Sequence, residues 1–152
     1  MNYHGITKTS VVNGEGLRVV LWVSGCNHQC EGCHNPETWD PKSGMIFDSE
    51  AKAELFKALK RSWIDGLTLS GGDPLHPVNV DEITALVKEI KEIFPHKTIW
   101  LYTGYTYRAV QDLEVLKFVD VIVTGPFIKE LADPSYKYAG STNQEIIRLK
   151  EV

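Results

Sequence analysis

The stretch that decides the fold is RVVLWVSGCNHQCEGC, residues 18–33. Its first six residues form a continuous apolar, β-branched run, which is typical of a buried strand. Gly25 follows this run, and three cysteines then fall within eight residues: Cys26, Cys30 and Cys33. This order predicts a buried strand that carries a cysteine-bearing loop at its carboxyl end.

Strands and helices are predicted to alternate on the C-terminal side of this stretch. Short apolar runs that end at glycine predict strands, while apolar residues at helical spacing predict helices. We expect strands over 6–12, 18–23, 66–70, 98–102, 119–123 and 145–150. We expect a loop over 24–47 and three helices, which begin at Asp48–Ser49, at Asn79 and shortly before Ala109.

This alternation predicts a parallel sheet built from right-handed βαβ units, and therefore an α/β fold. A length of 152 residues suits one domain, so residues 1–152 are expected to form a single unit. In parallel α/β folds, ligands bind at the carboxyl ends of the strands. Four predicted strands end there in glycine-bearing turns, at Gly25, Gly71-Gly72-Asp73, Thr103-Gly104 and Thr124-Gly125.

Composition and charge exclude some classes of partner. The chain has 16 basic and 20 acidic residues, a formal net charge of −4, which argues against a nucleic-acid partner. No apolar run approaches the ~18 residues of a transmembrane helix. The N-terminus lacks the basic and then apolar layout of a signal peptide. We expect a cytoplasmic protein with no membrane partner.

The cysteines indicate metal chemistry. Their number is odd, so they cannot all pair in disulfides, and a secreted scaffold would spread them along the chain. Three thiolates in one compact loop suit an iron–sulfur cluster or zinc. A [4Fe–4S] cluster normally takes four cysteines, so three would leave one iron open to an exogenous ligand. The alternative is a zinc site that adds His28 or His34 as the fourth ligand.

Longer motifs carry a resemblance to a known group of enzymes. The spacing CxxxCxxC after a strand, with the later turn at Gly71-Gly72-Asp73, resembles the radical S-adenosylmethionine (AdoMet) enzymes. Within these, VNGEGLR (12–18), GCHNPETW (32–39) and SGGDPL (70–75) look like the glycyl-radical-enzyme activases. WLYTGY (100–105) and GSTNQ (140–144) look more particularly like the short activases of anaerobic ribonucleotide reductase. The chain departs from that pattern at two positions. The family often has an acidic residue where this chain has Thr124, before Gly125, and often a basic residue where it has Ala139, before Gly140.

The resemblance implies a fold and a reaction. The fold would be an incomplete β/α barrel of the radical SAM type, with a mostly parallel sheet. Cys26, Cys30 and Cys33 would be the catalytic, metal-ligating residues of a [4Fe–4S] cluster whose open iron chelates AdoMet. Reductive cleavage would give methionine and a 5′-deoxyadenosyl radical, which abstracts hydrogen from a glycine of the anaerobic ribonucleoside-triphosphate reductase large subunit. A one-electron donor such as flavodoxin would supply the electron.

The resemblance also implies which residues meet AdoMet. Glycines let the backbone approach a ligand closely, so the Gly-Gly-Asp turn is expected at the methionine end, with Gly72 kept small to leave room for it. Gly32, Cys33 and His34 are expected beside the adenine. Asn35 could hydrogen-bond the ribose or a carboxylate, and Thr103, at a strand end, is expected to line the same pocket. The expected cofactor-binding residues are Gly32, Cys33, His34, Asn35, Gly71, Gly72, Asp73 and Thr103.

Three other functions stay open. The chain could activate another glycyl radical enzyme such as pyruvate formate-lyase, although those activases are usually longer, or it could be a radical AdoMet enzyme that acts on a small molecule. From a different class, it could be a non-catalytic zinc- or iron–sulfur-binding module. Among the remaining side chains, we expect Trp22, Trp63 and Trp100 in the core and His76 and Arg148 on the surface.

Overall fold

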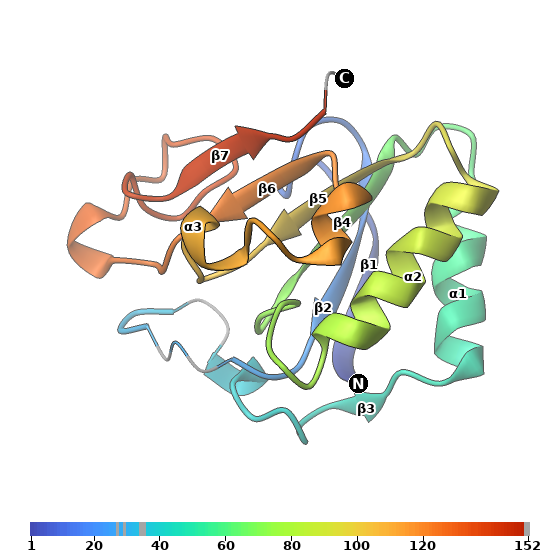
Figure 1. Ribbon diagram of the computed structural model, residues 1–152, viewed down its shortest axis with the longest axis horizontal. Coiled ribbons are helices and arrows are strands. Elements are labelled where there is room, and N and C mark those ends of the chain that lie inside the picture. Colours follow the sequence, from blue (N-terminus) through green and yellow to red (C-terminus); the bar gives the residue numbers. More distant parts are fainter. Residues whose placement is uncertain (27, 29, 34–35, 151–152) are drawn as a thin grey trace.

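The computed structural model describes residues 1–26, 28, 30–33 and 36–150. At its centre is a seven-stranded sheet with the order β3-β1-β2-β4-β5-β6-β7 (Figure 1). The four neighbouring strands in the middle are parallel: β2 (Arg18–Val23), β4 (Gly66–Gly71), β5 (Thr98–Tyr102) and β6 (Val121–Thr124). The outer strands pair antiparallel: β1 (Asn2–Ser10), β3 (Met45–Ile46) and β7 (Glu145–Arg148). The predicted α/β class is confirmed, with a mixed sheet.

The helices cover one face of this sheet. α1 (Ser49–Leu59) and α2 (Val80–Ile93) lie side by side in Figure 1, and Phe56 meets Phe94 near their ends with ring centroids 6.0 Å apart. Their buried stripes join one face of β2, β4 and β5 in the main core. The remaining helical turns are α3 (Tyr107–Val110), η1 (Pro36–Thr38), η2 (Glu114–Lys117) and η3 (Lys129–Leu131). No helix in the described part of the chain is long and apolar enough to cross a membrane.

The other face of the sheet has a smaller cluster. Trp100, Val121 and Val123 are buried there against Tyr102 and Tyr138. Successive residues of a strand point to opposite faces of the sheet. Consecutive buried residues of β5 and β6 therefore belong alternately to the main core and to this smaller cluster. This second face is the one that borders the candidate site described below.

The two long helices begin where the sequence predicts, for different reasons. Asp48 caps α1, and its carboxylate accepts a hydrogen bond of 2.9 Å from the Ala51 amide, as expected for an N-cap. Asn79 precedes α2, but its side chain makes no capping bond. Its Nδ2 donates instead to the carbonyls of Ser24 at 2.8 Å and Asp73 at 3.0 Å. Asn79 therefore ties together the segments that follow β2 and β4.

Some local predictions are wrong. The first strand starts at Asn2 and ends at Ser10, because it pairs along the whole of β2 through two irregularities in register. The predicted third helix is split into α3 and η2, and β3 lies inside the predicted loop. Trp63 is 58% exposed and stacks near Arg61, whereas His76 is buried.

A buried arginine closes the amino end of the parallel strands. Arg18 is 1% exposed, and its five N–H groups donate to five acceptors at 2.8–3.0 Å. Its guanidinium carbon lies 5.7 Å from the centroid of the Trp100 ring. Burial lowers the pKa of Arg18 to about 10, opposed by the charges of Asp65 and Asp120. The acceptors are the hydroxyls of Thr68 and Thr98 and the carbonyls of Glu15, Leu67 and Thr98.

Candidate functional site

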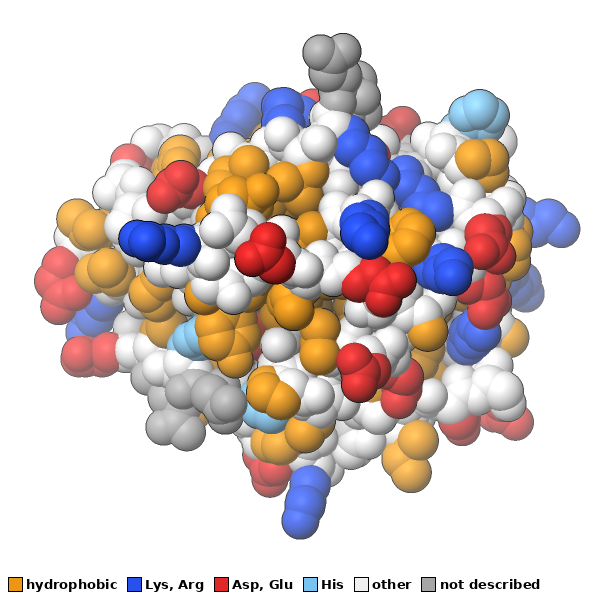
Figure 2. Space-filling model, viewed as in Figure 1, with side chains coloured by type: hydrophobic (Ala, Val, Ile, Leu, Met, Phe, Trp, Pro, Cys, Tyr) orange, Lys and Arg blue, Asp and Glu red, His pale blue; other side chains and the backbone are white. Residues whose placement is uncertain are grey.

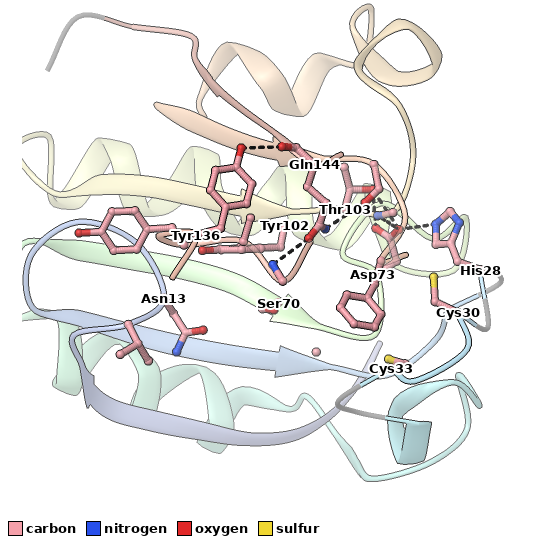
Figure 3. A pocket seen from close by; sticks show the side chains of 18 of the residues that line it. Asn13, His28, Cys30, Cys33, Ser70, Asp73, Tyr102, Thr103, Tyr136 and Gln144 are labelled. Carbon is pink, nitrogen blue, oxygen red and sulfur yellow. Dashed lines mark hydrogen bonds and ion pairs between the residues drawn. The ribbon is translucent and has the colours of Figure 1, made fainter. Parts of the chain in front are cut away.

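A cavity of about 800 Å³ lies at the carboxyl ends of the parallel strands, against the sheet face that the helices leave uncovered (Figure 3). Its floor includes Trp22, Ser70 and Tyr102, which alternate with residues of the main core. One end of the cavity holds the cysteines and the turn after β4. The other end holds residues 11–13, between β1 and β2, and residues 134–140.

Most of the site residues expected from the sequence come together in this cavity. Its lining includes Cys26, Cys30, Cys33, Gly71, Gly72, Asp73 and Thr103. Gly32 lies in an exposed turn and is not among the described residues that line the cavity. His34 and Asn35 lie outside the described residues.

Backbone hydrogen bonds hold the base of the cysteine loop, residues 24–33. The parallel pairing of β2 with β4 continues beyond both strands, because the Gly72 amide donates to the Val23 carbonyl at 2.8 Å and the Asp73 amide to the Gly25 carbonyl at 2.6 Å. On the other side, the Gly25 amide donates to Thr38 at 2.6 Å. These bonds bring the first cysteine beside the Gly-Gly-Asp turn.

Both glycines of that turn are required by the protein backbone. Gly71 has φ of +109°, and a Cβ there would lie 2.6 Å from backbone atoms of Val23. A Cβ on Gly72 would lie 2.6 Å from the Gly25 carbonyl oxygen and 2.9 Å from that of Thr38. The reason for a small residue at Gly72 is thus already present without a ligand, which revises the expectation that it only leaves room for methionine.

Asp73 is the most connected side chain of the site. It is 1% exposed, and both carboxylate oxygens lie 2.9 Å from the Thr103 hydroxyl that donates to them. The amides of Leu75 at 2.9 Å and Gly104 at 3.0 Å also donate to it. A fourth partner is the His28 ring, whose Nε2 lies 2.7 Å from Asp73 Oδ2. The carboxylate is therefore engaged by protein groups from three segments.

His28 is one of the residues of this site that sequence reasoning does not identify. It lies inside the cysteine loop, between Cys26 and Cys30, where the sequence alone suggests only a zinc ligand. Its ring contacts the edge of Tyr105, with centroids 4.6 Å apart, in addition to Asp73. The partners are more than 40 residues away along the chain, so no local spacing indicates this contact.

The C-terminal segment forms the far wall. The Gln144 side chain accepts hydrogen bonds from the amides of Gly140 at 2.8 Å and Ser141 at 3.0 Å and donates to the Gly125 carbonyl at 3.1 Å. Tyr136 reaches the same residue, because its hydroxyl donates to the Gln144 carbonyl at 2.8 Å. These bonds hold the segment 134–144 next to Gly125, which directly follows β6. Figure 3 shows Tyr136 and Asn13 at the end of the cavity away from His28 and the cysteines.

The donor set at the cysteine end fits an iron–sulfur cluster. None of the three cysteines, all within the described residues, is in a disulfide, and all three line the cavity. Among described side chains, no three His, Cys, Asp or Glu groups are placed to hold a single metal ion. In a [4Fe–4S] cluster each cysteine binds a different iron, so the three sulfur atoms need not converge on a single point as they would around one metal ion.

Comparisons with known proteins agree with this chemistry. The family model described as "4Fe-4S single cluster domain" matches residues 12–147. A protein of Enterobacteria phage T4 is 49% identical over 147 residues, 96% of this chain and 93% of the relative. Relatives from Haemophilus influenzae (45% identical, 99% of each chain) and Escherichia coli K12 (41% identical, 99% of this chain and 100% of the relative) have the same name. That name is anaerobic ribonucleoside-triphosphate reductase-activating protein, and the chain belongs to this family of [4Fe–4S] proteins.

Proposed function

We propose that the chain activates an anaerobic ribonucleoside-triphosphate reductase by generating a glycyl radical on it, through reductive cleavage of AdoMet at a [4Fe–4S] cluster. The observation that carries this proposal is the single cavity that three cysteines share with the Gly-Gly-Asp turn. The relatives' names support the same partner. On this account the chain is a radical SAM oxidoreductase.

The cysteines would hold the cluster at one end of the cavity. Three thiolates from Cys26, Cys30 and Cys33 leave one position for AdoMet. When bound, the cluster would supply one electron to AdoMet, and cleavage would give methionine and the radical that takes a hydrogen atom from glycine. A one-electron donor such as flavodoxin would provide that electron. The protein supplies binding and orientation, while the cofactors carry the chemistry.

The Gly-Gly-Asp turn and the end of β5 would bind the methionine part of AdoMet. Gly71 and Gly72 bring the backbone to the cavity surface without side chains. Thr103 and Asp73 border the same space. The resemblance assigns the adenosine part of AdoMet to residues around the third cysteine, namely Gly32, Cys33, His34 and Asn35.

The arrangement of the sheet supports an incomplete β/α barrel, formed by a single radical SAM domain. The helices cover one face and the cavity lies on the other, as on the inner side of a barrel. The parallel part has four strands, half of the eight that close a complete barrel. Antiparallel strands, β1 and β7, flank this part. The inner side is therefore open toward a partner protein.

The open end of the cavity suits a peptide segment. Val11 and Val12 line the cavity together with Tyr136 and Tyr138, and the two valines are 63% and 70% exposed. Exposed apolar side chains at a cavity rim favour protein contact. The glycine-bearing segment of the reductase would enter here and cover the cavity. By contrast, acidic and basic side chains are interspersed over α1 and α2 in Figure 2.

The test uses the reconstituted chain with a purified anaerobic reductase. Under anaerobic conditions with a reductant and AdoMet, the reductase should acquire one glycine-centred radical, detected by electron paramagnetic resonance. A reductase with that glycine replaced by alanine should show no such signal, although AdoMet still binds the activase. Turnover of a nucleotide without any partner protein would contradict the proposal.

Two substitutions test the entry of the segment. Val11→Asp with Val12→Asp should reduce radical formation on the reductase about tenfold or more, because docking would bury two carboxylates without partners. AdoMet cleavage without the reductase should stay at the wild-type rate. Ile93→Asp, an exposed apolar position at the far end of α2, is the control. Equal losses in both variants would place the docking surface elsewhere.

A further inference from the structure

The ring of His28 connects the cysteine loop to the rest of the site. Figure 3 shows it directed at Asp73, with Cys30 nearby on the same loop. The distance from His28 Nε2 to Asp73 Oδ2 is 2.7 Å, and the side chains are 17% and 2% exposed. A hydrogen bond to a carboxylate that is shielded from water is stronger than one at the surface.

Two neighbours restrict the position of this ring. Tyr105 packs edge-on against it at a centroid distance of 4.6 Å. Gly104 lies so close that a Cβ there would collide with the ring carbons of His28. The His28 ring is thus held between the Asp73 carboxylate, the Tyr105 ring and the backbone of Gly104.

Asp73 is itself fixed from the opposite side. The Thr103 hydroxyl at the end of β5 donates to it, as do the amides of Leu75 and Gly104. His28, Asp73 and Thr103 form a continuous series of contacts, called the clamp below. The clamp joins the cysteine loop to the ends of β4 and β5, whereas the backbone bonds described above hold only the base of that loop.

We propose that this clamp is a positioning device: it sets the tip of the cysteine loop at a fixed separation from the Gly-Gly-Asp turn. AdoMet would have to contact both parts at once, so the proposal rests on the proposed function for its ligand. A preorganised separation lowers the cost of binding, because the loop need not be ordered by the ligand. His28 then acts through the cysteine loop and needs no contact of its own with AdoMet.

The first test uses the protein without cluster or ligand. Hydrogen exchange of the backbone amides of residues 26, 28 and 30–33 is compared in wild type, His28→Ala and Thr103→Val. Both variants should exchange at least about tenfold faster there, since opening the loop no longer breaks the clamp. Thr103→Ser keeps the hydroxyl and should restore slow exchange. His96→Ala, an exposed histidine, is the matched control.

The second test measures the cluster and the ligand separately. After anaerobic reconstitution, His28→Ala should keep the wild-type iron content, because the three cysteines remain. Its dissociation constant for AdoMet should rise about 10- to 100-fold, as for residues that orient a metal site from behind the ligands. At saturating AdoMet, the rate of cleavage should fall less than the rate at low AdoMet. The double variant His28→Ala with Asp73→Asn should lose little more affinity than either single variant.

Opposite results would overturn the clamp. Wild-type exchange of the same amides together with wild-type AdoMet affinity in His28→Ala would show that the contact positions nothing. Loss of iron in that variant, with exchange unchanged, would make His28 a metal ligand instead. If wild-type protein failed to bind AdoMet, the proposed function would fail, and the exchange measurement would still decide whether the clamp holds the loop.

Discussion

Two buried charged side chains mark the opposite ends of the parallel strands. Arg18 at the amino end and Asp73 at the carboxyl end are each 1% exposed. Arg18 donates to hydroxyls and carbonyls around the starts of β2, β4 and β5 and packs on Trp100. Asp73 accepts from an adjacent strand end, from its own turn and from His28 in a long loop, and it borders a cavity.

The two ends differ in what their buried charged groups hold together. All five N–H donors of Arg18 are satisfied by neighbouring backbone and hydroxyl groups. The amino ends of the strands are therefore held together around a buried, fully hydrogen-bonded side chain. At the Asp73 end, the partners join separate segments around an open space. Parallel α/β barrel enzymes carry their active sites at the carboxyl ends of the strands and stabilising contacts at the amino ends, and the candidate site of this chain lies at the same carboxyl ends.

The largest effect on folding is expected at Arg18. Arg18→Met leaves buried carbonyls and hydroxyls without their donor and should lower the free energy of unfolding by about 3–5 kcal/mol. Urea denaturation of the apo protein measures this loss. Arg18→Lys keeps the charge but has fewer donors, so its free energy of unfolding should lie between those of wild type and Arg18→Met.

Arg148→Met is the matched control for that substitution. Arg148 pairs with Glu15 at the surface, where an ion pair contributes about 0–1 kcal/mol. If Arg18→Met cost no more than Arg148→Met, the amino end would not be the stabilising end.

A smaller effect that involves both stability and the site is expected at Gly72. Gly72→Ala places a Cβ against the carbonyl oxygens of Gly25 and Thr38, which displaces the base of the cysteine loop. Overpacking of this kind costs about 1–3 kcal/mol, and iron content after reconstitution should fall with it. Gly5→Ala, where nothing lies within 4 Å of the added carbon, is the control. Unchanged apo stability with AdoMet binding alone lost would return Gly72 to a purely ligand-facing role.

The smallest effect is a pH dependence that comes from Tyr102. Burial raises the pKa of Tyr102 above its ordinary value of 10.0, so the folded state keeps the proton where the unfolded chain loses it. Its contribution to stability is complete below about pH 10 and is lost as the pH rises further. Arg18 has the opposite sign, because its pKa is lowered to about 10 and the unfolded state binds more protons above that pH.

Tyr102→Phe removes one of these two contributions. The variant should lose stability less steeply than wild type between about pH 10 and about pH 11.5, as measured by urea midpoints. A steeper decline in Tyr102→Phe than in wild type would show that the Tyr102 proton is not retained on folding.

Local sequence patterns predicted the elements that local forces determine. The strands at 18–23, 66–70 and 98–102 and the starts of α1 and α2 were correct, because apolar periodicity and an Asp48 cap are short-range signals. β3 was missed because two exposed residues carry no such pattern. Exposure of Trp63 and burial of His76 depend on tertiary packing, which residue type alone does not give.

The candidate site divides in the same way. The cysteines and the Gly-Gly-Asp turn are contiguous motifs, and the rule that strand ends converge predicted that they meet. The contact from His28 to Asp73 spans 45 residues, and a single sequence contains no signal for such a pair. The wall that includes Tyr138 is not indicated by the sequence either, because Tyr138 packs against Trp100, far away along the chain, with ring centroids 5.3 Å apart.

The most direct test of the account is the electron paramagnetic resonance spectrum of the reduced, reconstituted protein with and without AdoMet. We expect about four irons per chain, a reduced-cluster signal, and a change of that signal on addition of AdoMet, because the ligand would bind the open iron. Cys26→Ala, Cys30→Ala and Cys33→Ala should each lack the signal. A full cluster in any of these variants, or a wild-type signal that AdoMet does not alter, would contradict the assignment of this cavity.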